Sequence, residues 1–172
     1  MRIAPTSKLL PTAALAALFL AALLPAAAAP SGHAAKAPKH DSVSGTAAHA
    51  GADPPYPLIQ VRIKAFAGAT GEKPRGSLST GSEVGLATYR GRVTCLAVFG
   101  NTATVGIEIV KSSDPELVGK GQLWSVVDNE ATGESDRIAG YPLTATAPSV
   151  CPRLFFNVPV VSGDYVVRDA TP

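Results

Sequence analysis

The sequence predicts an all-β domain folded as a single antiparallel, barrel-like meander with one disulfide. Short apolar segments alternate with polar residues at the period of two that is typical of strands. Glycine and proline separate these segments at short intervals, and no window carries a helical apolar period for more than two turns. A two-layer β-sandwich satisfies the same pattern and stays open as the alternative.

The clearest alternation lies in residues 59–65, Ile-Gln-Val-Arg-Ile-Lys-Ala. It places the four apolar side chains on one buried face and the three polar ones toward water. Residues 76–89, in which glycine recurs three times, are expected to hold one or two further short strands.

The most specific local pattern is a tight hairpin. Residues 92–99 and 102–110 are rich in β-branched and apolar residues, and Gly100-Asn101 between them tolerates positive φ. Beyond the hairpin lies a polar connection, residues 112–119. Further strands are expected at 121–127, 136–143 and 163–168, and the prolines of 144–159 predict an irregular segment or an edge.

The last of these strands is expected to close the barrel. Pairing of residues 165–167 with the strand around Val61 would remove the open edges of the sheet. This is our reason for preferring a barrel to a sandwich.

The first 29 residues have the three parts of a cleavable secretory signal peptide. Arg2 and Lys8 give a positive start, residues 9–24 are an apolar run, and a series of alanines suits cleavage after Ala29. The run is short for a membrane span. We therefore expect an exported protein, secreted or held in the cell envelope, with no membrane span after cleavage.

Residues 30–55 are predicted to form a flexible linker. They are rich in Ala, Gly, Pro and Ser, and Val43 is their only large aliphatic residue, so they bury too little apolar surface to offset the entropy of ordering. The β domain is then expected to span residues 56–172.

Removal of the signal peptide makes the protein neutral. Two of its 15 basic residues lie before residue 30, which leaves 13 basic and 13 acidic residues. A neutral domain offers no basic patch for nucleic acid, so no nucleic-acid partner is expected.

The chain has two cysteines, Cys95 and Cys151. In the oxidising compartment that export implies, two such cysteines are expected to form a disulfide. Closing so long a loop stabilises the domain by about 4 kcal/mol in a chain-entropy treatment.

The predicted β domain lacks the residues that common catalytic and metal sites use. All three histidines, His33, His40 and His49, fall in the predicted linker, which cannot hold a histidine base or zinc ligand in fixed geometry. Residues 68–73 lack the spacing of a phosphate loop. We expect no catalytic residue of these types, no bound metal and no cofactor.

The acidic segment of residues 128–136 is the most chemically varied part of the chain. We predict a polar hairpin turn, with Asn129 or Gly133 at positive φ and Asp136 paired to Arg137 or another base. An oxygen-rich calcium loop is the alternative, although the ligand spacing of an EF-hand is absent.

Four residues are candidates for contact with a ligand at the rim of the barrel: Trp124, Asp128, Asn129 and Asp136. Trp124 is expected to lie in the core. Alternatively it is displayed outward with Gln122 and Val126, where it would stack on a sugar or anchor a partner.

Several short motifs resemble a small secreted domain of unknown function found in exported proteins of actinobacteria. The likeness covers most of residues 56–172 and implies a secreted, disulfide-pinned β domain without known catalytic residues. One departure is Glu130, where the pattern has glycine after Asp-Asn. The motifs are Gly91-Arg92-Val93-Thr94-Cys95-Leu96, Gly100-Asn101, Val127-Asp128-Asn129, Asp136-Arg137, Val150-Cys151-Pro152, Val161-Ser162-Gly163-Asp164 and Asp169-Ala170.

These observations predict a non-enzymatic β-barrel that acts outside the cell or in its envelope as a binding or structural module. Its expected partner is a small apolar molecule inside the barrel, or a glycan or envelope protein at the rim. The alternative is a small hydrolase, for example on glycans, that uses carboxylates alone and needs two of them to converge in a concave site.

Overall fold

The structure is a computed structural model that describes residues 38–51, 57–82, 85–155 and 157–170. These residues contain eight antiparallel strands and two short 3₁₀ helices. The elements are β1 (Asp41–Ala50), β2 (Leu58–Ala67), β3 (Arg75–Ser82), β4 (Tyr89–Phe99), β5 (Thr102–Ser112), η1 (Pro115–Leu117), β6 (Gly121–Val127), η2 (Glu130–Thr132), β7 (Arg137–Gly140) and β8 (Val158–Arg168).

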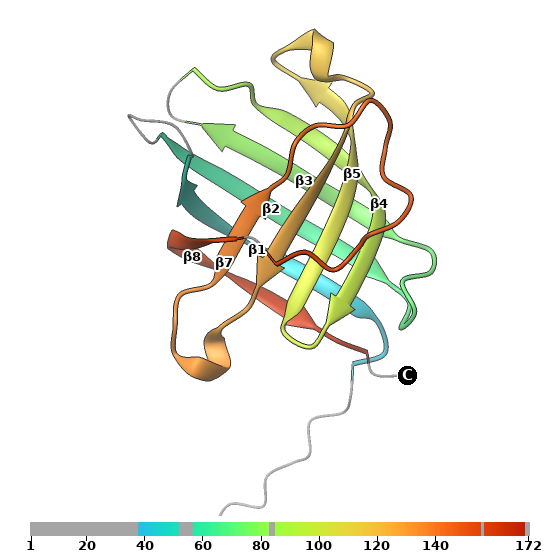
Figure 1. Cartoon of the computed structure of the whole chain (residues 1–172), viewed down its shortest axis with the longest axis vertical. Helices are drawn as coiled ribbons and strands as arrows, with labels where there is room; N and C mark the ends of the chain where they lie inside the picture. Colours follow the sequence, from blue (N-terminus) through green and yellow to red (C-terminus); the bar gives the residue numbers. More distant parts are fainter. Residues whose placement is uncertain (1–37, 52–56, 83–84, 156, 171–172) are drawn as a thin grey trace, which may run out of the picture. The chain divides into compact units, whose positions relative to one another are not determined.

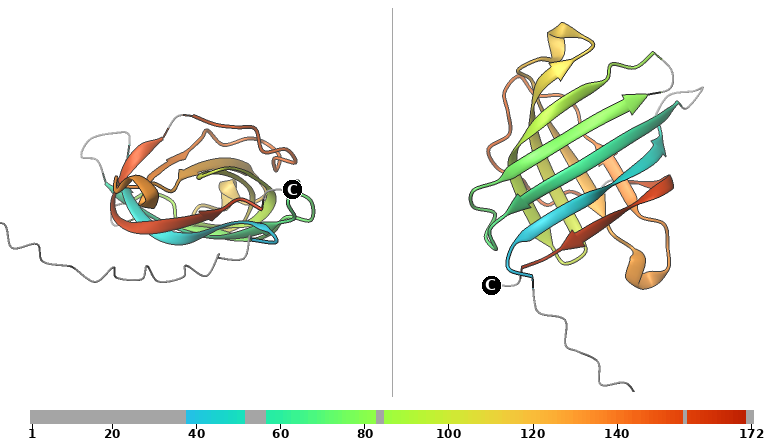
Figure 2. Two further views of the ribbon diagram at one scale, coloured as in Figure 1. Left: turned by 90° about the horizontal axis from the view of Figure 1, so that it is seen from below. Right: turned by 180° about the vertical axis from the view of Figure 1, so that it is seen from behind.

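The strands form a closed barrel in which each pairs with its neighbours in sequence and β8 returns to pair with β1. Figure 1 shows the strands crossing the barrel obliquely, and Figure 2 shows the barrel from below and from behind. The predicted antiparallel meander is confirmed, and it closes as a barrel rather than stacking as a sandwich. The predicted hairpin at Gly100-Asn101 joins β4 to β5.

The prediction of a flexible linker over residues 30–55 is wrong for residues 41–50, which form β1. This strand pairs with β2 along its whole length and with β8 on its other side. Its buried positions are Asp41, Val43, Ala47 and His49, of which two are polar and one is small, so it lacks the contrast between large apolar and polar residues that marks a strand in sequence. Residues 30–37 and 52–55 of the predicted linker, and the predicted signal peptide, lie outside the described residues.

The closing pair also differs from the prediction. The strand around Tyr165 pairs with β1, and β1 lies between it and the strand around Val61. Two strand ends also differ from the prediction. β7 stops at Gly140 instead of residue 143, and β8 begins at Val158 instead of residue 163. The segment between them is irregular apart from one isolated bridge, as its prolines predict.

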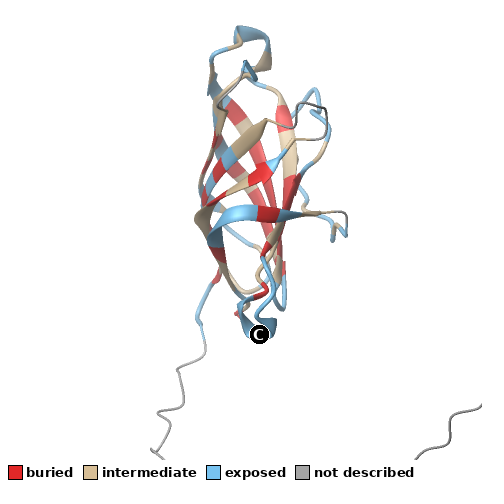
Figure 3. Ribbon diagram, turned by 90° about the vertical axis from the view of Figure 1, so that its left-hand side faces the viewer, coloured by how far each residue is buried: buried red, intermediate tan, exposed pale blue. Residues whose placement is uncertain are grey.

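Apolar side chains fill the interior of the barrel, which Figure 3 marks as buried bands along the strands. Tyr165 is the largest fully buried side chain, and its hydroxyl donates a hydrogen bond to the Val61 carbonyl at 2.8 Å. Its ring lies against Gly45 of β1, where an added Cβ would stand 2.7 Å from Tyr165 Cδ1. Small residues on β1 thus make room for a large one on β8. The fully buried side chains include Val43, Val61, Ile63, Leu78, Ile107 and Val126.

The disulfide Cys95–Cys151, predicted from the cysteine count, is present with a Cα–Cα distance of 5.6 Å. It holds the segment before β8 against the outer face of β4 and β5. Gly106 of β5 lies beneath it, and a Cβ there would stand 2.5 Å from Cys95 Sγ. Thr94 Oγ1 donates to the Pro148 carbonyl at 2.6 Å, which fixes the same segment. The outer face of this part of the sheet is therefore covered.

No helix among the described residues has the length and apolar character that a membrane span requires.

Candidate functional site

A cavity of about 330 Å³ lies at the end of the barrel where β1 ends and β4 begins. In Figure 1 this is the upper end, where β3 ends and β4 begins. Beneath the cavity the barrel is filled by the core. Its lining residues include Gly140 of β7 and come from six strands; the principal side chains are His49, Ile59, Thr80, Tyr89, Gln122 and Trp124.

A hydrogen-bonded group of three side chains forms one wall. Gln122 Oε1 accepts hydrogen bonds from the Tyr89 hydroxyl and, at 3.2 Å, from Trp124 Nε1. Gln122 Nε2 donates to the Tyr141 carbonyl at 2.8 Å, which fixes the orientation of the amide. Burial raises the pKa of Tyr89, so its hydroxyl keeps its proton and acts as a donor. These partners hold the two aromatic rings in place and satisfy their polar atoms.

His49 lies next to Trp124 in the lining of the cavity. Its ring meets the Trp124 ring in an edge-on contact, with centroids 6.2 Å apart and planes at 71°. His49 Nδ1 lies 3.0 Å from the Ala50 carbonyl oxygen, whereas Nε2 is buried and has no hydrogen-bond partner. Burial lowers the pKa of the imidazole, which favours the neutral ring.

The rest of the lining is mainly apolar. Ile59 and Ala87 contribute aliphatic surface, and Trp124 contributes an indole that is 3% exposed. No Asp, Glu, Lys or Arg is among the described residues that line this cavity. Such a site suits a small neutral molecule with a large apolar part, and its volume lies at the lower end of the range for ligand pockets, roughly 300–1,000 Å³.

The structure separates the four predicted contact residues. Trp124 lies in the core, as its first interpretation states, and it also lines the cavity. Asp128, Asn129 and Asp136 lie in the connection between β6 and β7, at the opposite end of β6 from Gly121. None of these three lines the cavity.

Asp136 ties this connection to β8. It is 4% exposed, and its two carboxylate oxygens accept hydrogen bonds from the Asn129 N–H at 2.8 Å and the Tyr165 N–H at 2.6 Å. The predicted pairing with Arg137 is wrong, because the Arg137 guanidinium donates to the side chain and carbonyl of Asn157. Gly133 has the positive φ expected of a turn residue, and Asn129 does not.

The side chains of Asp128 and Asn129 also form hydrogen bonds with main-chain groups. Asp128 Oδ2 accepts from the Val167 N–H at 2.9 Å, and Asn129 Nδ2 donates to the Ser135 carbonyl at 2.8 Å. Burial and the neighbouring Asp136 carboxyl raise the pKa of Asp164, which is exposed beside this group. The carboxyl groups of Asp136 and Asp164 therefore approach one another. Both oxygens of the buried Asp136, however, already accept hydrogen bonds from main-chain N–H groups.

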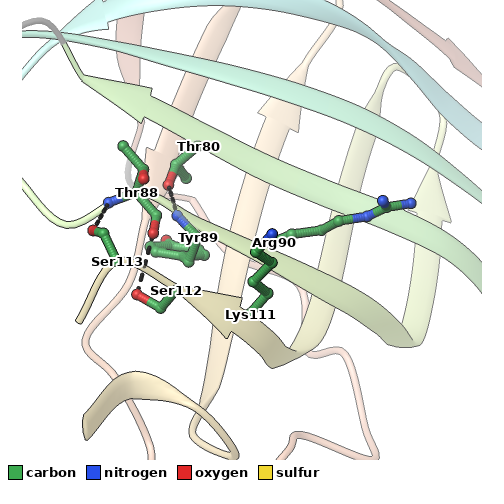
Figure 4. Close-up of a pocket in the computed structure, with 7 residues that line it drawn as sticks. All are labelled: Thr80, Thr88, Tyr89, Arg90, Lys111, Ser112 and Ser113. Atoms are coloured by element: carbon green, nitrogen blue, oxygen red, sulfur yellow. Dashed lines mark hydrogen bonds between the residues drawn. The ribbon is translucent and has the colours of Figure 1, made fainter. Parts of the chain in front are cut away.

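A second hollow, of about 290 Å³, lies where β4 begins and β5 ends, and Figure 4 shows its lining. Its hydroxyl groups are used to join the strand ends. Ser113 Oγ accepts from the Thr88 N–H, Ser112 Oγ donates to the Thr88 carbonyl, and Thr80 Oγ1 accepts from the Tyr89 N–H. The side chain of Arg90 extends away from these groups in Figure 4. We therefore regard this hollow as a structural junction.

The sequence pattern does not predict that His49, Tyr89 and Gln122 belong to one site. His49 had been assigned to the linker, so the domain was wrongly expected to contain no histidine. A signal was present, because Val43, Ala47 and His49 follow the period of two that places them on one face of a strand. Tyr89 and Gln122 come together only through the closure of the barrel.

Comparisons of this chain with known protein families, curated proteins and solved structures found no match.

Proposed function

We propose that this protein is a secreted or cell-envelope binding module that holds a small, largely apolar molecule in the cavity at the end of its barrel. The observation that carries the proposal is a cavity of about 330 Å³ whose wall holds aromatic rings fixed by hydrogen bonds.

Three further points support the proposal. The cavity is lined by strands rather than by exposed loops alone, so the barrel holds its aromatic walls rigidly. The disulfide agrees with an oxidising compartment. The signal peptide expected from the first 29 residues, and the resemblance to exported domains, point to the same location.

A carboxylate-dependent hydrolase has weaker support. Asp136 and Asp164 approach one another, but both oxygens of Asp136 accept main-chain hydrogen bonds and its side chain is buried. A general acid or nucleophile must reach its substrate. The aromatic cavity lies elsewhere and contains no carboxylate among the described residues that line it.

The test uses 2-methylnaphthalene as an apolar probe of two rings. The chain has a single tryptophan, so its indole N–H gives one signal in a ¹⁵N–¹H spectrum, and that signal reports on the cavity wall. We expect the Trp124 signal to shift in a saturable manner as the probe is added. A cavity of this size predicts a dissociation constant in the micromolar to millimolar range, on the order of −4 to −8 kcal/mol.

Two matched substitutions locate the binding. Ala87→Phe adds a ring to a residue that lines the cavity, whereas Ala131→Phe makes the same change at an exposed residue of η2, outside it. We expect the first variant to lose at least tenfold in affinity and the second to bind as the parent protein does. Equal binding by both variants, or no binding by the parent protein, would contradict the proposed function.

A further inference from the structure

The outer surface of β2 to β5 carries a concentration of basic side chains. Arg62 of β2 and Arg90 of β4 both pair with Ser79 of β3, so these three side chains point to the same side of the sheet. Arg90 also pairs with Lys111 of β5. Leu78, on the alternate face of β3, is buried in the core, and the row therefore faces outward.

More basic side chains lie beside this row on the same outer surface. Lys64 of β2 and Arg92 of β4 both pair with Ser77 of β3, and Arg75 precedes Ser77 by two residues on that strand. Together these strands display six exposed cations, which we call the basic face: Arg62, Lys64, Arg75, Arg90, Arg92 and Lys111.

The cations of the basic face outnumber its carboxylates. Glu108, which forms an ion pair with Arg92 at 2.6 Å, is the single acidic residue of β2 to β5, all of whose residues the structure describes. Arg90 and Lys111 stand directly opposite one another, and like charges at paired positions destabilise a sheet. Acidic residues gather elsewhere, four of them in residues 128–136 between β6 and β7. The fold thus concentrates positive charge on one wall.

The basic face is open to solvent and its arginines are held along the surface. The rear view in Figure 2 shows β1 to β4 as a wall that no other described segment crosses. Arg62 Nε donates to Thr46 Oγ1 of the neighbouring strand at 3.2 Å. The Arg90 side chain extends away from the hydroxyl groups of the second hollow in Figure 4. A large partner can therefore reach the cations without a change in the fold.

The positions between the cations carry hydroxyl groups. Ser77 and Ser79 of β3 lie between the basic residues of β2 and β4. Cations two residues apart on a strand are separated by about 7 Å, and neighbouring strands by about 5 Å. Anionic groups on successive sugars of a glycan repeat on this scale, and sugar hydroxyls exchange hydrogen bonds with serine. The basic face therefore suits a polymer that carries both kinds of group.

Nucleic acid and lipid fit the same face less well. A single-stranded nucleic acid stacks its bases on exposed aromatic rings. β2 and β3, at the centre of the basic face, carry one aromatic residue, Phe66, and Arg75 already lies over its ring, 5.9 Å from the centroid. Insertion into lipid requires apolar side chains, whereas serine occupies the positions between the cations.

We infer that the basic face is a second binding site, which takes an anionic glycan whose carboxylate, sulfate or phosphate groups pair with its cations. The inference is independent of the proposed function, because the face lies on the outside of the wall and the cavity lies at the end of the barrel. A neutral net charge does not exclude such a surface, because the barrel separates charges of opposite sign.

The first experiment titrates the full chain at pH 7 with heparin, a sulfated glycan, and with dextran, an uncharged one. Isothermal titration calorimetry measures both affinities. We expect saturable binding of heparin that weakens as NaCl is added, since salt screens exposed charges, and no binding of dextran. Absence of heparin binding at low salt, or equal binding of the two polymers, would overturn the inference.

Matched charge changes locate the site. Arg62→Gln combined with Arg90→Gln removes two cations of the basic face, whereas Lys120→Gln combined with Arg153→Gln removes two cations outside it. We expect the first double variant to bind heparin at least about tenfold more weakly and the second to stay within about twofold of the parent protein, because counterion release counts only the charges in contact. Equal losses in the two variants would refute the basic face as the site.

Further titrations distinguish a glycan from other polyanions and separate the two proposals. We expect a DNA duplex, and vesicles of phosphatidylcholine with phosphatidylglycerol, to bind more weakly than heparin, and tighter binding of either would refute a glycan partner. The Trp124 signal of the first double variant should respond to 2-methylnaphthalene as in the parent protein, which shows that its fold is intact. Loss of heparin binding with this response retained counts against the basic face alone, whereas failure of 2-methylnaphthalene to bind the parent protein counts against the cavity alone.

Discussion

At the scale of single residues, the protonation of His49 links pH to stability. The side chain is buried against Trp124, and burial lowers the pKa of its imidazole. An ordinary histidine has a pKa of about 6.5, so the unfolded chain takes up a proton there at a higher pH than the folded protein does. The folded state is then disfavoured whenever the unfolded state binds the extra proton.

This argument predicts a loss of stability in mild acid. As the pH falls from 7 to 5, the free energy of unfolding of the parent protein should decline more steeply than that of His49→Phe, by about 1 kcal/mol over the interval. Urea denaturation followed by circular dichroism at each pH measures it. His40→Phe should keep the slope of the parent protein, and a slope unchanged in His49→Phe would show that His49 titrates alike in both states.

At the scale of elements, the hydrogen bonds of Asp136 join the connection after β6 to β8. The β7–β8 seam has two register pairs, Arg137↔Pro159 and Ile138↔Val158, whereas β1 pairs along its whole length with β2. The seam is thus the shortest pairing in the barrel. Main-chain donors bound to a buried carboxylate compensate for the few ladder bonds there.

We predict that Asp136→Ala costs about 3 kcal/mol of stability, because it leaves two buried N–H groups without a partner, at about 1–3 kcal/mol each. Asp114→Ala provides the comparison, since Asp114 also accepts a main-chain hydrogen bond, from Glu116, but at the exposed start of η1. Its loss should cost about 1 kcal/mol or less. Urea denaturation at pH 7 measures both, and equal losses would contradict a special role for Asp136.

A strand can be predicted from the sequence when large apolar residues alternate clearly with polar ones along it. Residues 59–65 and the hairpin around Gly100-Asn101 carry strong contrast, and the structure confirms both. β1 carries little, because Gly45 and Ala47 leave room for Tyr165, a residue more than a hundred positions away. The residues around Gly45 do not indicate that the Tyr165 side chain of β8 will fill the space beside them.

The same reasoning applies to the candidate site. Trp124 and the disulfide follow from residue type and compartment, which a sequence displays directly. The meeting of Tyr89 with Gln122 depends on the stagger of the strands in the closed barrel, and this is a property of the whole sheet. His49 belongs to the site because residues 41–50 form β1. The predicted domain boundary at residue 56 excluded this strand and therefore its histidine.

At the scale of the whole molecule, β1 decides whether the barrel closes. It fills the gap between β2 and β8, carries His49, and accepts the C-terminal segment through Asp41, whose Oδ1 binds the Ala170 N–H at 3.0 Å. Without β1 the edges of β2 and β8 face solvent with unpaired main-chain groups, and Tyr165 loses the surface against which its ring packs.

A chain beginning at Tyr56, the boundary suggested by composition alone, should therefore fail to fold. We expect chains beginning at Pro30 and at Pro38 to unfold cooperatively in urea with similar midpoints, because both keep β1. The chain from Tyr56 should show no cooperative transition and should aggregate, since it loses pairing along two strands and the burial of Val43 and Ala47. Circular dichroism and size-exclusion chromatography compare the three. A cooperative transition in the chain from Tyr56 would mean that β2 and β8 can pair directly, so that the barrel closes with one strand fewer.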